Sequence, residues 1–531
     1  MAIIKSIGHW VKQQQKSLLL FLYLALPLFF CLYLGEHRHL LKRSLYLGIC
    51  TFGLMLPWLA LPRFFRGLLF VYLPVYLIYW LGFCHLLIFD VPLNRSSILT
   101  MLDSNSGEIK EFLHTFYTTP ILLLTLTLLA GCCLLLLRLL SYPVTSERNR
   151  IPLILSLSAC LFAWNKGFHN TVYHRNQLLP YRVAGGAYEY YQTRKELLKL
   201  KQEHTVPEFP SLRSRHPSDH PQTYVIVIGE SAAKNHLQWY GYHRETSSYT
   251  RQLPRPYIFT NVRSPHSLTL QSLRKVLTYA HDDKIAEGLR QGSLVNIFNA
   301  AGFKTFWLSN QLSSGKNDNL IGIIGNDAAE ATFINDNNDY MTSITKGITY
   351  DEKLLPLITN ALRDPAARKV IFVHLMGSHS PYDWRIPETE KYYAGQTDNP
   401  LQKFVDEYDD TIRYTDKLLA QILTQTFTSS ADAYLLYFSD HGEDISASPE
   451  SCRCHIGDQY ATPPMYEIPF LLWTNQAFKR SNPELTANMP GWLTRKFNTQ
   501  HLIHAIPHLS GLSLKETESA HNLFAADFKA D

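Results

Sequence analysis

Long apolar stretches in the first third of the chain constrain its fold more than any other feature. Five stretches have the composition of transmembrane helices. Most of them approach the roughly 20 residues that an α-helix needs to cross the hydrocarbon core of a bilayer. They cover residues 17–34, 44–61, 67–89, 119–140 and 151–165. We therefore expect residues 1–165 to form a transmembrane domain of five helices.

Basic residues around these stretches predict the orientation of the chain. They precede the first stretch, separate the second from the third, and lie at or between the fourth and fifth. Because Lys and Arg are enriched in cytoplasmic loops, this pattern places the N-terminus in the cytoplasm. Basic residues at 38–43 go against it, since that loop would lie outside. With five crossings, the rest of the chain lies beyond the cytoplasmic membrane.

Residues 166–221 are predicted to bridge the membrane domain and a soluble domain at 222–531. Aromatic and basic residues over 188–200 form an amphipathic helical pattern, which suits the headgroup region of a membrane. Pro, Ser and His are frequent over 207–221, as in a linker. A second amphipathic pattern at 105–113 fits either a helix on the membrane surface or a solvated connector.

Net charge and cysteine content exclude fewer classes of function than the apolar stretches do. A formal charge of +5 on 531 residues gives no case for a nucleic-acid partner. Six of the eight cysteines lie in the apolar part, and Cys452 and Cys454 lie in the soluble part. This distribution does not establish an oxidising compartment, and whether these two cysteines pair is left open.

The soluble part predicts an α/β domain with a largely parallel sheet, because strand-like runs alternate with helical patterns such as 404–425. The expected strands are 224–228, 304–308, 370–375, 433–439 and 468–473. The first runs without a break into Gly229, Glu230 and Ser231, as a buried central strand would. Ser231 could then be a nucleophile at the sheet edge, or it could cap a helix that opens over 232–236.

Acidic and imidazole side chains follow three of these strands. Glu230 ends the first strand, His379 follows the third, and Asp440 and His441 follow the fourth. If these strand ends converge, Glu230, Asp440 and His441 would hold one metal ion, and Ser231 would also coordinate it. The charge of the ion would favour the alkoxide of Ser231.

Considered alone, His379 and His455, which lies in the loop after His441, would each be expected to have no functional role. Together with other motifs in a fixed order, however, they make the soluble part resemble the alkaline phosphatase superfamily, and within it the membrane-bound phosphoethanolamine transferases. The resemblance covers nearly the whole chain. In the soluble part it rests on residues 229–231 with His236, and on residues 240–246, 307–311, 350–356, 374–382, 408–416 and 439–443.

The resemblance implies a two-step transfer. The nucleophile would attack the phosphorus of phosphatidylethanolamine, and the phosphoethanolamine group would then pass to lipopolysaccharide, on an inner-core sugar or lipid A. It implies that Glu230, Ser231, Asp440 and His441 surround zinc, and that His379 and His455 bind the donor phosphate or a second zinc ion. It also implies a bacterial inner-membrane protein whose catalytic domain lies in the periplasm.

Lys234 and Arg244 are further candidates for neutralising phosphate charge, and Asn310 is another candidate site residue. The chain departs from better-known relatives in having Ser231 where they usually have Thr, and Ala233 where a basic residue is common. Its few soluble-domain cysteines weaken the case for lipid A, which leaves core sugars, other glycans or a protein open as acceptors.

Three other functions remain open from the motifs. A phosphoglycerol transferase would have the same fold and metal chemistry. A sulfatase or phosphodiesterase would pass its group to water, but sulfatases need Pro two residues and Arg four residues after the nucleophile, where this chain has Ala233 and Asn235. A non-catalytic envelope-binding membrane protein is the alternative from another class.

Overall fold

The computed structural model describes most of the chain from residue 65 onward. The described ranges are 65–89, 91–104, 119–141, 179–203, 207–280, 285–311, 320–335, 349–445, 455–515 and 517–530, with isolated positions at 15, 18–20, 22, 23 and 109. The predicted spans 17–34 (apart from scattered positions), 44–61 and 151–165, the pattern at 105–113, and Cys452 and Cys454 lie outside these residues.

Two compact units make up the chain. One contains residues 1–99 and 116–188, and the other contains 100–115 and 189–531. The domain boundaries expected at 165 and 221 stay predictions.

Helices α3 (Phe65–Phe89) and α6 (Thr119–Leu140) form over the predicted apolar stretches 67–89 and 119–140. Within the described residues, the segment Leu123–Leu140 is long and apolar enough to cross a membrane, and Leu77–Phe89 is a shorter apolar helix. The count of five membrane helices therefore stays a prediction. Helix α8 (Leu179–Glu203) covers the predicted amphipathic pattern.

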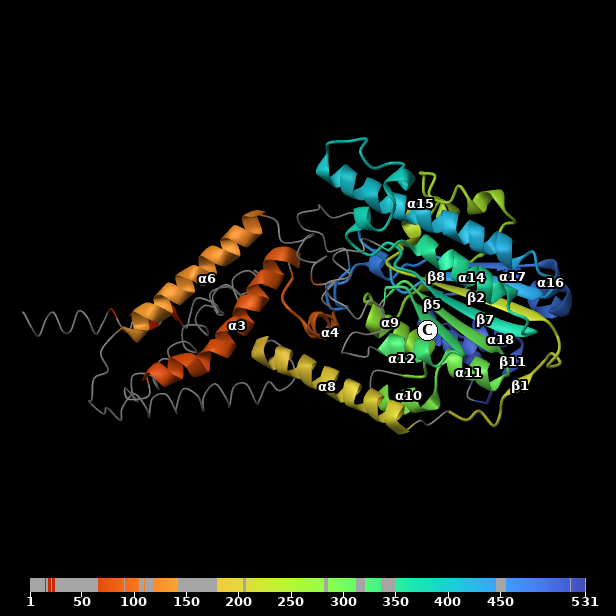
Figure 1. The fold of residues 1–531 in the computed structure, drawn as a ribbon, viewed down its shortest axis with the longest axis horizontal. Coiled ribbons are helices and arrows are strands. Elements are labelled where there is room, and N and C mark those ends of the chain that lie inside the picture. The colour runs from red at the N-terminus through yellow and green to blue at the C-terminus, as the bar shows by residue number, and fades with distance from the viewer. Residues whose placement is uncertain are drawn as a thin grey trace, which may run out of the picture. The chain divides into compact units, whose positions relative to one another are not determined.

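A seven-stranded sheet forms the centre of the second unit (Figure 1). It contains all five predicted strands and two short ones. In spatial order the strands are β3 (Tyr257–Ile258), β9 (Phe470–Thr474), β8 (Asp432–Ser439), β2 (Gln222–Gly229), β7 (Arg368–His374), β5 (Lys304–Ser309) and β6 (Glu330–Phe333). Strands β8, β2, β7, β5 and β6 pair in parallel. Strand β9 is antiparallel to β8 and to β3, so the sheet is mixed.

Strand β2 is central because its side chains are apolar on both faces. All eight of its residues are buried. Successive side chains point to opposite faces of a strand, so Tyr224, Ile226 and Ile228 enter one core and Val225 and Val227 enter the other. The first core is covered by α9 (Thr269–Leu277), α11 (Leu294–Ala300), α12 (Leu320–Asn326) and α18 (Leu502–Leu509), and the second by α14 (Leu355–Arg363) and α15 (Pro400–Thr426). The result is an α/β/α sandwich.

The parallel register brings four strand ends together. Gly229 pairs with Ser439, Ile228 pairs with His374, and Ser309 also pairs with His374. The segments that follow β2, β5, β7 and β8 therefore leave the sheet at one edge, where reactive groups gather in α/β proteins.

Candidate active site

Ser231 lies at the carboxyl end of β2 in an unusual backbone conformation. Among the described residues it is the one non-glycine residue with a positive φ, at 57°. No α-helix opens behind it, because the chain continues into the short 3-10 turn η3 (Lys234–His236), with Ala233 at the N-cap. The alternative in which Ser231 caps a helix opening over 232–236 is therefore not what forms, since only this 3-10 turn follows. Instead of capping a helix, the Ser231 hydroxyl donates a hydrogen bond to Glu230 Oε1 at 2.7 Å.

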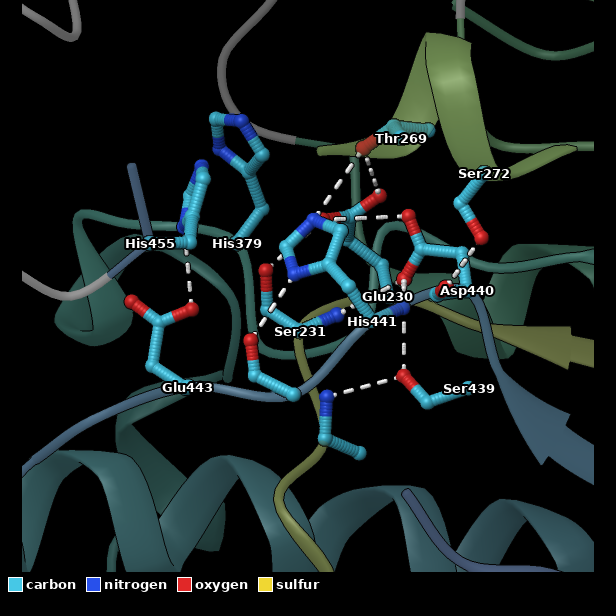
Figure 2. A network of polar contacts seen from close by, with 12 residues as sticks. Glu230, Ser231, Thr269, Ser272, His379, Ser439, Asp440, His441, Glu443 and His455 are labelled. Carbon is cyan, nitrogen blue, oxygen red and sulfur yellow. Dashed lines mark hydrogen bonds and ion pairs between the residues drawn. The ribbon is translucent and has the colours of Figure 1, made fainter. Parts of the chain in front are cut away.

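Glu230, Ser231, Asp440 and His441 form one buried cluster (Figure 2). The backbone N–H of Ser231 donates to Asp440 Oδ1 at 3.1 Å. His441 Nε2 lies 3.3 Å from Glu230 Oε1 and 3.5 Å from Asp440 Oδ2. The strand ends thus converge as the sequence predicts. Each of the four side chains has at most 1% of its surface exposed, so each charge needs a partner within the protein.

The cluster fits a metal ion. Ligand atoms of Glu230, Asp440 and His441 lie within 4.8 Å of one another. Among the described residues, Asp440 Oδ2 is buried with no hydrogen-bond partner, which is costly unless a cation compensates it. His441 Nδ1 donates to the Gly442 carbonyl at 2.8 Å, which leaves the Nε2 lone pair for a ligand bond once Nε2 is deprotonated. Carboxylate and imidazole groups suit zinc.

The charges in the metal-free cluster are strongly perturbed. Burial alone would raise the pKa of Glu230, but the hydrogen bond from His441 and its charge hold that pKa well below the ordinary value. Burial and the nearby charge of Glu230 raise the pKa of Asp440 to about 7. Burial would lower the pKa of His441, but the charges of Asp440 and Glu230 raise it to about 10. Without metal, both ring nitrogens of His441 are therefore protonated at neutral pH, and the side chain is positively charged.

Two residues that the sequence analysis did not single out fix Glu230. Gln311 Nε2 donates to Glu230 Oε2 at 3.0 Å, and Thr269 Oγ1 donates to the same oxygen at 3.2 Å. Gln311 follows β5 within a motif of the family resemblance, so its place at the strand end was a usable signal. Thr269 lies in a different segment, at the start of α9, and no strand or motif pattern marks it.

Further contacts hold the backbone around Ser231. Tyr408, on α15, donates from its hydroxyl to the Ser231 carbonyl at 2.7 Å and accepts the Ala233 N–H at 2.8 Å. Ser439 Oγ accepts the Ala232 N–H at 2.9 Å. These contacts compensate the polar groups that a positive φ takes out of regular structure.

His379 and His455 lie beside the cluster (Figure 2). Their ring centroids are 6.2 Å apart, and the His455 ring is 4.6 Å from that of His441. His455 Nδ1 bonds Glu443 Oε2 at 3.0 Å, and Tyr382 donates to the other Glu443 oxygen at 2.9 Å. Glu443 lies within the 439–443 motif but is not among the predicted site residues. With His441 and His455 it makes a second group of ligand atoms within 4.8 Å.

The three further candidates contact other groups. Lys234 Nζ lies 3.3 Å from the Thr260 carbonyl and 3.5 Å from Glu467. Arg244 forms ion pairs with Asp406 and Asp409, both at 2.7 Å. Asn310 is buried and donates to Asp351 at 2.8 Å. These contacts favour structural roles for Arg244 and Asn310, and their assignment as site residues stays a prediction.

Comparison with known proteins identifies the family of this domain. The Sulfatase family pattern matches residues 222–502, which is more than half of the chain. The chain belongs to the sulfatase family. This sulfatase-family protein is 28% identical over 471 residues to phosphoethanolamine transferase EptC of Escherichia coli K12, covering 84% of this chain and 80% of that protein. It is 27% identical over 467 residues to phosphoethanolamine transferase CptA of Salmonella typhimurium, covering 83% and 79%. The resemblance to membrane-bound phosphoethanolamine transferases is confirmed.

Solved structures agree with this kinship. The periplasmic domain of Escherichia coli EptC, crystallised in complex with Zn, superposes with a TM-score of 0.56 at 29% identity and covers 62% of this chain and 92% of that one. The integral membrane protein EptA of Neisseria meningitidis superposes with a TM-score of 0.70 over 97% of this chain and 99% of that one. Its 18% identity supports a shared fold over nearly the whole length of this sulfatase-family chain.

A substitution at Gly377, which follows β7, would test how closely the backbone packs around Glu230. The φ of Gly377 is 52°, and a Cβ there would lie 2.8 Å from the Glu230 carbonyl oxygen. We expect Gly377→Ala to destabilise the protein by about 1–3 kcal/mol and to displace Glu230. Denaturant unfolding and zinc titration measure both effects. Gly395→Ala is the matched control, since Gly395 has a φ of 85° and nothing within 4 Å of its added Cβ. Equal effects of the two changes would contradict the close contact.

Zinc binding is expected to release protons. Metal ligands must be deprotonated, and His441, with a pKa of about 10, holds a proton below that pH in the metal-free site. Each zinc ion should therefore release about one proton or more at pH 7, and zinc affinity should rise with pH up to about the His441 pKa. Calorimetry in buffers of different ionisation enthalpy measures the released protons. Affinity that is constant between pH 6 and 9, with no proton release, would contradict this arrangement.

Proposed function

We propose that this protein transfers phosphoethanolamine from phosphatidylethanolamine to lipopolysaccharide, on an inner-core sugar or lipid A, through a covalent intermediate on Ser231. The observation that carries the proposal is the buried hydroxyl of Ser231 held 2.7 Å from Glu230 beside Asp440 and His441. The relatives named as phosphoethanolamine transferases support the group that is transferred. A Zn complex of the EptC domain supports zinc as the metal, and the group of ligand atoms on Glu230, Asp440 and His441 supports its proposed place beside Ser231.

In the first step, Ser231 Oγ bonds to the phosphorus, and the bond from phosphorus to the diacylglycerol oxygen breaks. The proton of Ser231 leaves toward Glu230 Oε1, which already accepts its hydrogen bond. Zinc held by this cluster would lower the pKa of the Ser231 hydroxyl and neutralise phosphate charge. In the second step, a hydroxyl oxygen of the acceptor bonds to the phosphorus, the bond from phosphorus to Ser231 Oγ breaks, and Ser231 Oγ regains its proton from Glu230.

The leaving diacylglycerol oxygen needs a proton, and we propose that His455 supplies it. Its Nδ1 is held by Glu443 at 3.0 Å, as in a carboxylate-oriented imidazole. The Nε2–H is then the proton that His455 can give, and the same nitrogen can take a proton from the acceptor in the second step. His379 beside it is proposed to bind the phosphate oxygens. If His379 and His455 bind a second zinc ion instead, that role replaces proton donation by His455.

The location follows from the same proposal. Residues 1–165 would anchor the protein in the bacterial inner membrane, residues 166–221 would bridge, and residues 222–531 would act in the periplasm. A lipid donor remains in the bilayer, so an anchored site meets it at high effective concentration. The helix that is long enough to span a membrane and the fold shared with EptA over 97% of this chain support an anchored enzyme.

The first test is mass spectrometry of envelope glycolipids from cells that carry the intact gene or its Ser231→Ala variant. We expect a phosphoethanolamine-sized increment with the intact protein and none with the variant, because the covalent step needs the hydroxyl. The exposed Ser430 supplies the control variant Ser430→Ala, which should keep full transfer. Fragmentation of the modified glycolipid locates the acceptor group.

Other outcomes of this experiment are decisive too. Equal product from Ser231→Ala would remove the proposed nucleophile and favour a non-catalytic role. A phosphoglycerol-sized increment would show that the transferred group is phosphoglycerol and not phosphoethanolamine. An increment on another glycan or a surface protein would change the assigned acceptor but leave the proposed reaction as it is.

The proton donor has its own test. His455→Gln is expected to slow transfer by about 10²–10⁴-fold with a lipid donor. The loss should be much smaller with a nitrophenyl phosphoethanolamine donor, whose leaving group needs no proton. Rates for both donors are compared with His220→Gln as the matched control, since His220 also pairs with a carboxylate, Asp432, at the opposite end of β8. Equal losses with both donors would exclude this role for His455.

A further inference from the structure

Three histidines far from Ser231 in the sequence gather near the C-terminus. His501 ends the turn η11 (Thr499–His501), His504 lies on α18, and His521 ends the turn η12 (Ser519–His521). One ligand nitrogen from each lies within 4.8 Å of the others. The ring centroids of His501 and His521 are 4.2 Å apart, and that of His504 is 6.3 and 6.1 Å from them. We refer to these residues as the histidine triad.

The triad is buried on one side and open on the other. His501 and His504 have 5% and 4% of their surface exposed, whereas the His521 side chain is 35% exposed. The Tyr279 and Phe497 rings pack against His504 and His501 at 5.6 and 6.4 Å. An ion could therefore reach the triad from solvent on the His521 side and lie against an aromatic wall.

Glu518 contacts both His504 and His521 and orients their rings. Its carboxylate accepts from His521 Nδ1 at 2.9 Å, so His521 Nε2 carries the lone pair. A carboxylate on the outer nitrogen is the usual support of a metal-binding imidazole. The backbone N–H of Glu518 donates to His504 Nδ1 at 3.3 Å, so that nitrogen also carries a lone pair, for which a metal ion would compete.

We propose that His501, His504 and His521 form a second metal site, for Zn²⁺ or a similar divalent transition-metal ion. Three imidazoles with one position left for water or a carboxylate are a common ligand set for such ions. Bonds of about 2.0–2.1 Å to a tetrahedral ion would bring the nitrogens to roughly 3.4 Å from one another. The triad would close by about an ångström and fasten the turn η12 to α18.

This site is separate from the one at Ser231. The two share no residue, and α9 lies between them. Thr269, the first residue of α9, donates to Glu230, whereas Tyr279, two residues beyond its end, contacts the His504 ring. Nine helical residues span about 14 Å at 1.5 Å per residue. One ion cannot serve both sites, so each can be emptied without removing a ligand of the other.

The test measures zinc content and affinity in the full-length protein, purified in detergent, stripped with a chelator and titrated with Zn²⁺. His521→Gln should bind one ion fewer than the unaltered protein. The double variant Glu230→Gln/His441→Gln should keep the triad's ion. His508→Gln, on the same helix but outside the triad, is the matched control and should bind as many ions as the unaltered protein. Zn²⁺ should also raise the Tm of the double variant but not that of the double variant with His521→Gln added.

X-ray absorption of zinc bound to Glu230→Gln/His441→Gln gives an independent answer if His521→Gln does not fold. Scattering from three imidazoles is expected. A double variant that holds no zinc, or zinc without imidazole ligands, would overturn the proposal. Unchanged zinc content in His521→Gln would also overturn it and leave the triad as a packed aromatic cluster. Loss of transfer in Ser231→Ala bears only on the proposed reaction, so the two proposals can fail separately.

Discussion

The carboxylates of Glu230 and Asp440 are buried close to the imidazole of His441. The arrangement of the site depends on how the negative charge of these two carboxylates is compensated. A protonated His441 compensates part of it in the metal-free protein, which explains why its pKa rises while that of Glu230 falls. Asp440 Oδ2 is left without a hydrogen bond among the described residues. Such a concentration of negative charge is costly without a cation, so the same feature that destabilises the metal-free domain suits it to hold a metal ion.

The sheet supplies the rigidity that this site needs. Strand β2 is held between β7 and β8 in continuous parallel register, and apolar cores cover both of its faces. Ser231 can therefore adopt a positive φ at the strand end, because Tyr408, Ser439 and Asp440 fix the backbone around it. In the proposed reaction, a hydroxyl held in this way would lose little further conformational freedom on attack, which is how preorganisation assists a nucleophile.

The two clusters of metal-type ligands differ in chemistry. The cluster at Ser231 combines carboxylates with an imidazole and contains a hydroxyl, the proposed nucleophile, which suits the proposed phosphoryl transfer. The histidine triad consists of three imidazoles with no carboxylate or hydroxyl among its members, and these lie on η11, α18 and η12. An ion there would act on stability, because metal bound by distant segments stabilises the folded state over the unfolded one.

Much of this protein follows from local patterns in its sequence. Apolar runs predicted the helices α3 and α6, alternating strands and helices predicted the α/β domain, and acidic and imidazole residues after strands predicted the cluster of Glu230, Asp440 and His441. These features could be predicted because the spacing of apolar residues and the position of a residue at a strand end are properties of short segments of sequence. The antiparallel direction of β9, the 3-10 turn in place of an α-helix after Ser231, and the contacts of Gln311 and Thr269 with Glu230 could not be predicted in the same way. Strand direction and long-range contacts, like the triad of His501, His504 and His521, depend on which distant segments pack together, and only the tertiary structure decides that.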